Sequence, residues 1–272
     1  MKIAQFHDKE RIRLGIINDN SLIPCDFKGE MIDFIKTKTE CKPSGKAIAL
    51  ANITLAPPVS SPSKIVAIGL NYSDHIRESK GDVPKFPLIF AKFPNSLIGH
   101  KDLITWDVNL TKKVDFEAEL AVIIGKRVHK CSETEAMEAI FGYTIANDVS
   151  ARDLQFGDGQ WVRGKSLDTF CPLGPWITTA DDIPDPHSLG IRCWLNGQIM
   201  QDSTTSMMIF KLPELISFIS HNFTLTPGDI ILTGTPHGVG TFREPSIYMT
   251  DGDEVVVEIE KVGRLVNVCH TM

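Results

Sequence analysis

The chain has 272 residues and a mass of 30.1 kDa, which is enough for one large domain or for one domain with a small appendage. Its 42% hydrophobic and 23% charged residues are typical of a globular protein, and its net charge of −6 argues against nucleic-acid binding. No apolar run approaches the roughly 20 residues of a membrane span, and the charged N-terminus does not resemble a signal peptide, so we expect a cytoplasmic protein with no membrane partner.

Six cysteines are scattered along the chain without a C-x-x-C pair. In a cytosolic protein such cysteines are typically reduced thiols in the core or on the surface. We therefore expect free thiols at all six positions: Cys25, Cys41, Cys131, Cys171, Cys193 and Cys269.

The first part of the chain, residues 1–57, has the pattern of a small N-terminal β-rich domain. Short apolar runs at 2–6, 14–18 and 21–25 predict strands, and 31–39 predicts a helix. The stretch "LAPPVSSPSK" at 55–64 is rich in proline and serine, as expected of a linker or a domain edge. We therefore expect a catalytic domain from residue 58 to residue 272.

The second part mixes strands and helices without a regular alternation. Buried strands are predicted at 64–69, 118–125 and 228–234, and helices at 73–80, which Ser73 or Asp74 could cap, and at 211–222. A capping box at Ser132 and Glu135 begins another helix, Asn196-Gly197 predicts a hairpin, and 253–269 predicts a final hairpin. This order indicates an α+β fold with mixed or antiparallel sheets.

The segment "GQWVRGKS", Gly159–Ser166, matches the phosphate-binding P-loop pattern. A P-loop needs a buried strand before it and a helix after it. The preceding "SARDLQFGD" is too charged for a buried strand, and the following "LDTFCPLGPWI" has two prolines where a helix would start. The context therefore argues against nucleotide binding, and Lys165 needs another explanation.

An acidic cluster gives a sharper signal. Side chains alternate along a strand, so Asp115, Glu117 and Glu119 should share one face of "VDFEAELAVIIG". Asp148 ends another apolar run, where a strand's last residue commonly enters a site. Clustered carboxylates suit a hard divalent cation. From the spacing alone, a solvated edge strand stays an equal alternative.

His75 and Glu78 in "GLNYSDHIRE" lie three residues apart on the predicted helix. At this spacing a carboxylate can orient and polarise an imidazole, which is the arrangement of a general base. An ordinary surface pair is the alternative interpretation.

Taken together, these segments resemble the fumarylacetoacetate hydrolase family in its compact branch. The resemblance covers residues 64 to the end and rests on seven motifs in order: "GLNYSDHIRE", "KFPNSLIGH", "DFEAELAVIIGKR", "NDVSARDLQ", "GKSLDTFCPLGPWI", "MQDSTTSMMIF" and "PGDIILTGTPHGVG". Some relatives carry Arg before the Asn-Tyr pair, where this chain has Leu70, so the far end of the substrate stays open.

The resemblance implies a fold of rolled mixed β-sheets with few helices and commonly a homodimer. It implies Mg²⁺ or Mn²⁺ on Glu117, Glu119 and Asp148, ligands that Ca²⁺ can also use. It further implies a catalytic His75–Glu78 dyad on a mobile lid, with Lys165, Gln155 and Thr235 binding the carboxylate of a small 2-oxo acid.

For the reaction we favour hydrolysis of a carbon–carbon bond in a β-diketo acid, such as an acylpyruvate, through an enolate stabilised by a divalent metal. The alternative is a decarboxylase or isomerase of a related 2-oxo diacid, such as oxaloacetate or 2-hydroxyhepta-2,4-diene-1,7-dioate. Because the same enolate serves all of these reactions, the sequence does not separate them.

Overall fold

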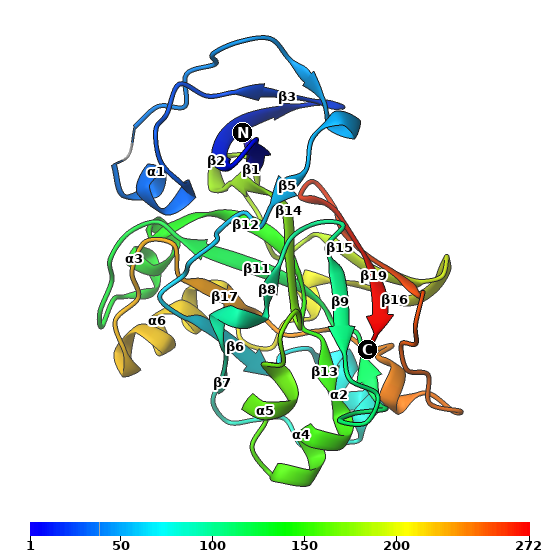
Figure 1. Cartoon of the computed structure of the whole chain (residues 1–272). Helices are drawn as coiled ribbons and strands as arrows, with labels where there is room; N and C mark the ends of the chain where they lie inside the picture. Colours follow the sequence, from blue (N-terminus) through cyan, green and yellow to red (C-terminus); the bar gives the residue numbers. More distant parts are fainter. Residues whose placement is uncertain (38) are drawn as a thin grey trace.

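The computed structural model describes residues 1–37 and 39–272. The N-terminal part is built from β1 (Lys2–Asp8), β2 (Arg11–Asn18), β3 (Ser21–Pro24), α1 (Met31–Thr37), β4 (Ile48–Ala49) and β5 (Leu55–Ala56). It lies at the top of Figure 1, in blue. β1 pairs with β14 (Cys171–Thr179), so one sheet runs from the N-terminal strands into the rest of the molecule. The domain boundary after residue 57 stays a prediction, and the sheet crosses it.

The main sheet continues from β14 in the order β12, β11, β17, β6 and β7. β17 and β6 are parallel, whereas the other neighbours along this path are antiparallel, which makes the sheet mixed. β8 pairs in parallel with β14. The bounds are β6 (Ile65–Gly69), β7 (Leu88–Lys92), β8 (Leu97–Ile98), β11 (Ala118–Ile124), β12 (Ile140–Asn147) and β17 (Ile230–Leu232).

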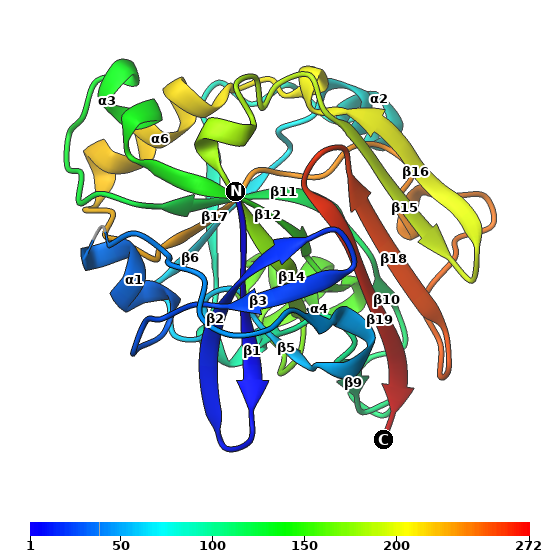
Figure 2. The same ribbon diagram turned by 90° about the horizontal axis from the view of Figure 1, so that it is seen from above.

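A second sheet has the order β16, β15, β18, β19 and β9, and Figure 2 shows it beside the main sheet. Asn196 and Gly197 join β15 to β16 with φ angles of 50° and 77°, the turn that the Asn-Gly pair predicts. The bounds are β9 (Leu103–Trp106), β15 (Gly190–Leu195), β16 (Gln198–Thr204), β18 (Glu254–Ile259) and β19 (Gly263–Thr271).

The helices are short and lie at the edges of the sheets. They are α2 (Ser73–Ser79), α3 (Glu133–Glu138), α4 (Arg152–Asp158), α5 (Val162–Lys165) and α6 (Leu212–Asn222). The small sheet of β10 (Val114–Asp115) and β13 (Ser150–Ala151) lies beside α4 and α5. Among the described residues, no helix has the length and apolarity needed to cross a membrane. The α+β fold predicted from the sequence is confirmed.

β11 is buried along its whole length, because apolar groups cover both of its faces. Leu120 and Val122 belong to the core cluster shared with the second sheet, and Ala121 and Ile123 belong to the cluster shared with α1. This two-sided packing explains why the sequence of β11 is a continuous apolar run. Glu119 is thereby carried into the interior on a strand that cannot shift without breaking two cores.

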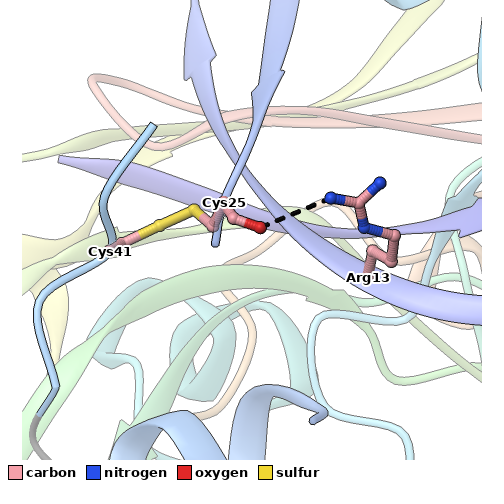
Figure 3. Close-up of a disulfide and its surroundings, with 3 residues drawn as sticks. All are labelled: Arg13, Cys25 and Cys41. Carbon is pink, nitrogen blue, oxygen red and sulfur yellow. Dashed lines mark hydrogen bonds between the residues drawn. A yellow bond between two sulfur atoms is a disulfide. The ribbon is translucent and has the colours of Figure 1, made fainter. Parts of the chain in front are cut away.

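Two local predictions are wrong. Neither Ser73 nor Asp74 caps α2, since its N-cap is Tyr72, which makes no side-chain capping bond. Cys25 and Cys41 are not free thiols: they form a disulfide with Cα atoms 5.7 Å apart (Figure 3), and the Cys25 carbonyl accepts a bond from Arg13. Cys25 directly follows β3 and Cys41 lies in the chain after α1, so the fold brings together two residues that are separated by 16 positions in the sequence. The other cysteines are buried free thiols.

Candidate active site

The register of β11 and β12 brings three acidic side chains together. Ala118 lies opposite Asn147, and the backbone N–H of Asp148 donates to the carbonyl of Glu117 at 2.9 Å. Glu117, Glu119 and Asp148 are all buried, and one oxygen of each lies within 4.8 Å of those of the other two. The predicted metal ligands therefore form one cluster. The edge-strand alternative is wrong, because β11 lies inside the sheet.

This cluster fits a hard divalent cation. Three carboxylate oxygens supply the ligand type that Mg²⁺ and Mn²⁺ prefer. Burial raises the pKa of Glu119 well above its usual value, and the charges of Asp148 and Glu117 raise it further. A bound cation would relieve this repulsion. The identity of the ion stays a prediction.

Three buried cations surround the acids. Lys165 Nζ lies 2.8 Å from Glu117 Oε2 and 2.6 Å from Asp148 Oδ2, while Lys92 Nζ lies 2.6 Å from Asp148 Oδ1. Arg152 Nη1 lies 2.7 Å from Glu117 Oε1. Burial alone would raise the pKa of Glu117, but Lys165 and Arg152 outweigh it and hold the pKa at about 2.

Asp115 turns away from the metal cluster. Its carboxylate accepts from Arg152 Nε at 2.9 Å and from the backbone N–H groups of Gly240 and Thr241 at 2.8 and 3.0 Å. The chain leaves β10 at Asp115 and enters β11 only at Ala118, so the expected strict alternation from Asp115 to Glu119 is broken.

The charges around the cluster nearly balance. Four buried carboxyl groups, including Asp115, face the three cations, so the site has one excess negative charge when all four are ionised. A divalent cation would reverse that sign, and the site would then attract an anionic substrate.

The dyad lies beside the cluster on α2. His75 Nδ1 is 3.2 Å from Glu78 Oε2, and Glu78 Oε1 accepts from the backbone N–H of Gly238 at 2.9 Å. His75 is 7% exposed and its ring packs against Phe242 at 5.7 Å between centroids. Because Glu78 engages Nδ1, the other ring nitrogen is left for the cavity, the arrangement required of a base.

The predicted carboxylate-binding residues face the same cavity. Gln155 Oε1 accepts from Arg152 at 3.0 Å, and Thr235 Oγ1 accepts from Gln201 Nε2 at 2.8 Å. Lys165 ends the four-residue helix α5 and is followed by loop and β14, so no P-loop helix follows it.

A small cavity of about 80 Å³ joins these groups. His75, Glu117, Glu119, Gln155, Lys165 and Thr235 line it, together with Arg152. Asp148 lies behind Lys165, and Glu78 lies behind His75. The structure thus brings all the predicted site residues together, while their individual roles stay predictions. The remaining wall is apolar: Ile68, Gly69, Leu70, Phe90, Phe156, Trp161 and Phe242.

Several residues of the site are missed by sequence reasoning. Lys92 is 1% exposed, and a lysine that ends the strand "LIFAK" is the signal that could have found it. Arg152 binds Asp115 and Glu117, and not its neighbour in the sequence, Asp153. Asp153 instead accepts from Thr111 Oγ1 at 2.6 Å.

Comparison with known proteins points to one family. The family described as "Fumarylacetoacetate (FAA) hydrolase C-terminal" matches residues 64–269. "Oxaloacetate tautomerase FAHD2A, mitochondrial" of Bos taurus is 50% identical over 219 residues, which cover 80% of this chain and 69% of that protein.

Two solved structures cover the whole chain. A fumarylacetoacetate hydrolase from Exiguobacterium antarcticum superposes with a TM-score of 0.92 at 35% identity, over 100% of both chains. A 2-hydroxyhepta-2,4-diene-1,7-dioate isomerase from Mycobacterium marinum gives 0.85 at 35% identity, over 100% of this chain and 98% of that one. The chain belongs to the fumarylacetoacetate hydrolase family, as the resemblance of its motifs predicts.

Proposed function

We propose that this enzyme interconverts the enol and keto forms of a short 2-oxo acid of the oxaloacetate type. The observation that carries the proposal is the position of His75, which lines the same small cavity as Glu117, Glu119 and Lys165. The similarity to oxaloacetate tautomerases and to an isomerase supports the same reaction class. This reverses the preference that the sequence gives to hydrolysis.

A divalent cation on Glu117, Glu119 and Asp148 would supply Lewis-acid polarisation of the 2-oxo group. Lys165, Gln155 and Thr235 would hold the carboxylate and so fix carbon 3 relative to His75. In this orientation the proton to be moved lies next to a base that is itself held by Glu78.

His75 moves one proton between carbon 3 and the oxygen on carbon 2. In the keto-to-enol direction one C–H bond breaks, one O–H bond forms and no atom leaves the substrate. The imidazole must pass through its protonated form, which the Glu78 carboxylate stabilises. A small cavity with an apolar half suits this reaction because no water is consumed.

Hydrolysis of a β-diketo acid is the second candidate, since the fumarylacetoacetate hydrolase of Exiguobacterium antarcticum aligns with the whole chain. In that reaction His75 would activate a water molecule instead of moving a proton of the substrate.

Cytoplasmic localisation also stays a prediction, because the Bos taurus relative is named as mitochondrial. The homodimer implied by the motifs is likewise a prediction.

A panel of acids tests the proposal. Oxaloacetate, acetylpyruvate and a hydroxymuconate-type diacid are supplied with Mg²⁺ or Mn²⁺, and tautomerisation, carbon dioxide release and bond cleavage are measured separately. Metal-dependent tautomerisation of oxaloacetate that exceeds both other rates is expected. Efficient cleavage of acetylpyruvate without tautomerase activity would replace the proposal with hydrolysis.

A further inference from the structure

We propose that Trp161 determines substrate length and restricts the site to short 2-oxo acids. This inference rests on the proposed function and deepens it. The cavity has a polar half around the acids, Lys165 and Arg152, and an apolar half that includes Leu70, Trp161 and Phe242. The apolar half is where any part of a substrate beyond the reacting carbons would lie.

The position of Trp161 is fixed by three contacts. A Cβ atom on Gly69 would lie 2.3 Å from Cζ3 of Trp161, so the indole lies directly against the glycine backbone. Its ring meets Phe90 edge-on at 5.3 Å between centroids. Its carbonyl accepts from the backbone N–H of Lys165 at 3.0 Å. The wall and the carboxylate-binding lysine therefore belong to one rigid unit.

The enclosed space is small for a ligand site. Its volume of about 80 Å³ compares with roughly 300–1,000 Å³ for common ligand pockets. A space of this size favours an acid of few carbon atoms. A long acyl chain would require the indole to leave the Gly69 backbone.

Charge excludes long diacids for a second reason. Lys165 and Arg152 are the cations among the cavity's lining residues, and both already pair with Glu117. A distant carboxylate would lie against Leu70 and Phe242 without a cation, and burying an unpaired charge is costly. A short diacid avoids this cost because both of its carboxylates stay near the polar half.

The test compares acids that differ in chain length alone. Tautomerisation of acetylpyruvate, butyrylpyruvate and hexanoylpyruvate is measured with Mg²⁺, and binding of pyruvate and 2-oxooctanoate is measured by calorimetry. In the wild-type protein both kcat/KM and affinity should fall as the chain grows. Trp161→Ala should raise the ratio of long-chain to short-chain kcat/KM at least about tenfold, the usual effect of relieving a tight apolar pocket.

Two further variants serve as a substitute for Trp161→Ala and as a control. Trp161→Leu shortens the wall with less loss of packing, so it serves if Trp161→Ala does not fold. Trp194→Ala is the matched control, because Trp194 lies on β15 beside Arg264 and outside the cavity. Its length preference should equal that of the wild type.

Equal use of short and long chains by the wild-type protein, or an unchanged ratio in both Trp161 variants, would overturn the inference. The calorimetric binding measurements distinguish a failure of this inference from a failure of the proposed function. If no acid is turned over but Trp161→Leu still tightens 2-oxooctanoate relative to pyruvate, the length filter holds and the reaction is reassigned.

Discussion

At the scale of single residues, the site is a balance of buried charges that a cation would complete. Glu119 is 1% exposed, and among the described groups its carboxylate is held by one backbone donor, the N–H of Gly234 at 2.8 Å. Glu117 and Asp148, by contrast, each contact two cations. Of the three predicted metal ligands, Glu119 therefore has the fewest positive partners to offset its negative charge when no metal is present.

Glu119→Gln should weaken metal binding at least about tenfold and yet stabilise the metal-free protein. Burial and the neighbouring charges raise the pKa of Glu119, so removing its charge removes repulsion from the folded state. Mn²⁺ titration and urea unfolding in excess chelator measure the two effects. Full activity of the wild-type protein in excess chelator would contradict the metal assignment.

Lys165→Met should raise KM for a short 2-oxo acid and destabilise the metal-free protein by roughly 3 kcal/mol, because two buried carboxylates each lose one of their two cations. Excess Mg²⁺ should restore part of the lost stability. Lys126→Met is the control, since Lys126 is half exposed and pairs loosely with Glu138 at 3.7 Å. Measurable ATP binding that Lys165→Met abolished would reinstate the P-loop.

At the scale of elements, α2 is held more firmly than its polar sequence suggests. Tyr72 and Ile76 are buried, and Asp74 Oδ2 accepts from Ser203 Oγ at 2.6 Å and contacts His237 Nδ1 at 3.0 Å. These contacts anchor α2. Most of the exposed residues lie after the helix, between Lys80 and Phe86, while Arg77 is exposed on the helix itself. The ordering of a lid by substrate stays a prediction.

Asp74→Ala should lower kcat about tenfold or more with little change in KM or metal content, because it loosens the helix that positions His75. Asp74→Asn, which keeps one acceptor, should recover part of the rate. Asp202→Ala is the control: Asp202 is a half-exposed neighbour that pairs with Arg192. Equal loss in Asp74→Ala and Asp202→Ala would show a general effect on folding and not a positioning role.

His100 makes the contact between the β8–β9 connection and β19 sensitive to pH. Its Nδ1 accepts from the backbone N–H of Val266 at 3.1 Å, and burial, aided by Lys101, lowers the pKa of His100 from 6.5 to about 4. Between pH 6.5 and pH 4 the unfolded chain therefore binds more protons than the folded protein. The contribution of His100 to the stability of the folded state is full above pH 6.5 and is lost as the pH falls toward 4.

His100→Gln keeps an acceptor for Val266 but removes the titration, so the free energy of unfolding should fall less between pH 6.5 and 4 than in the wild type. Urea unfolding at several pH values measures the difference. His129→Gln, at an exposed position, should keep the wild-type slope. A wild-type slope in His100→Gln would assign the acid sensitivity to other groups.

At the scale of the whole molecule, local patterns were predictable and distant pairings were not. Glu117 and Glu119 are close in sequence, and the Asn196-Gly197 turn follows from its own φ requirements. Lys92, by contrast, is 56 residues from Asp148, and Arg152 is 37 residues from Asp115. Such pairs form only when the main sheet brings separate strands together, so no local pattern encodes them.

The choice between hydrolysis, decarboxylation and tautomerisation is likewise not encoded by any local pattern in the sequence. The motifs predict a divalent-metal site and a base, which hydrolysis, decarboxylation and tautomerisation share. The small cavity is a property of the assembled molecule, since its walls come from β6, β7, α4 and the loop after β17, among other segments. The shape of this cavity, together with the similarity to an oxaloacetate tautomerase and an isomerase, favours proton transfer within a short acid.

The most direct measurement follows oxaloacetate by NMR in deuterated water with Mg²⁺, comparing the wild type with His75→Ala. The account predicts fast interconversion of enol and keto forms and deuterium at carbon 3, with the carbon skeleton intact, and a rate about 10²–10⁴-fold lower in His75→Ala at unchanged metal content. An undiminished rate in His75→Ala, or loss of carbon dioxide as fast as deuterium enters carbon 3, would contradict it.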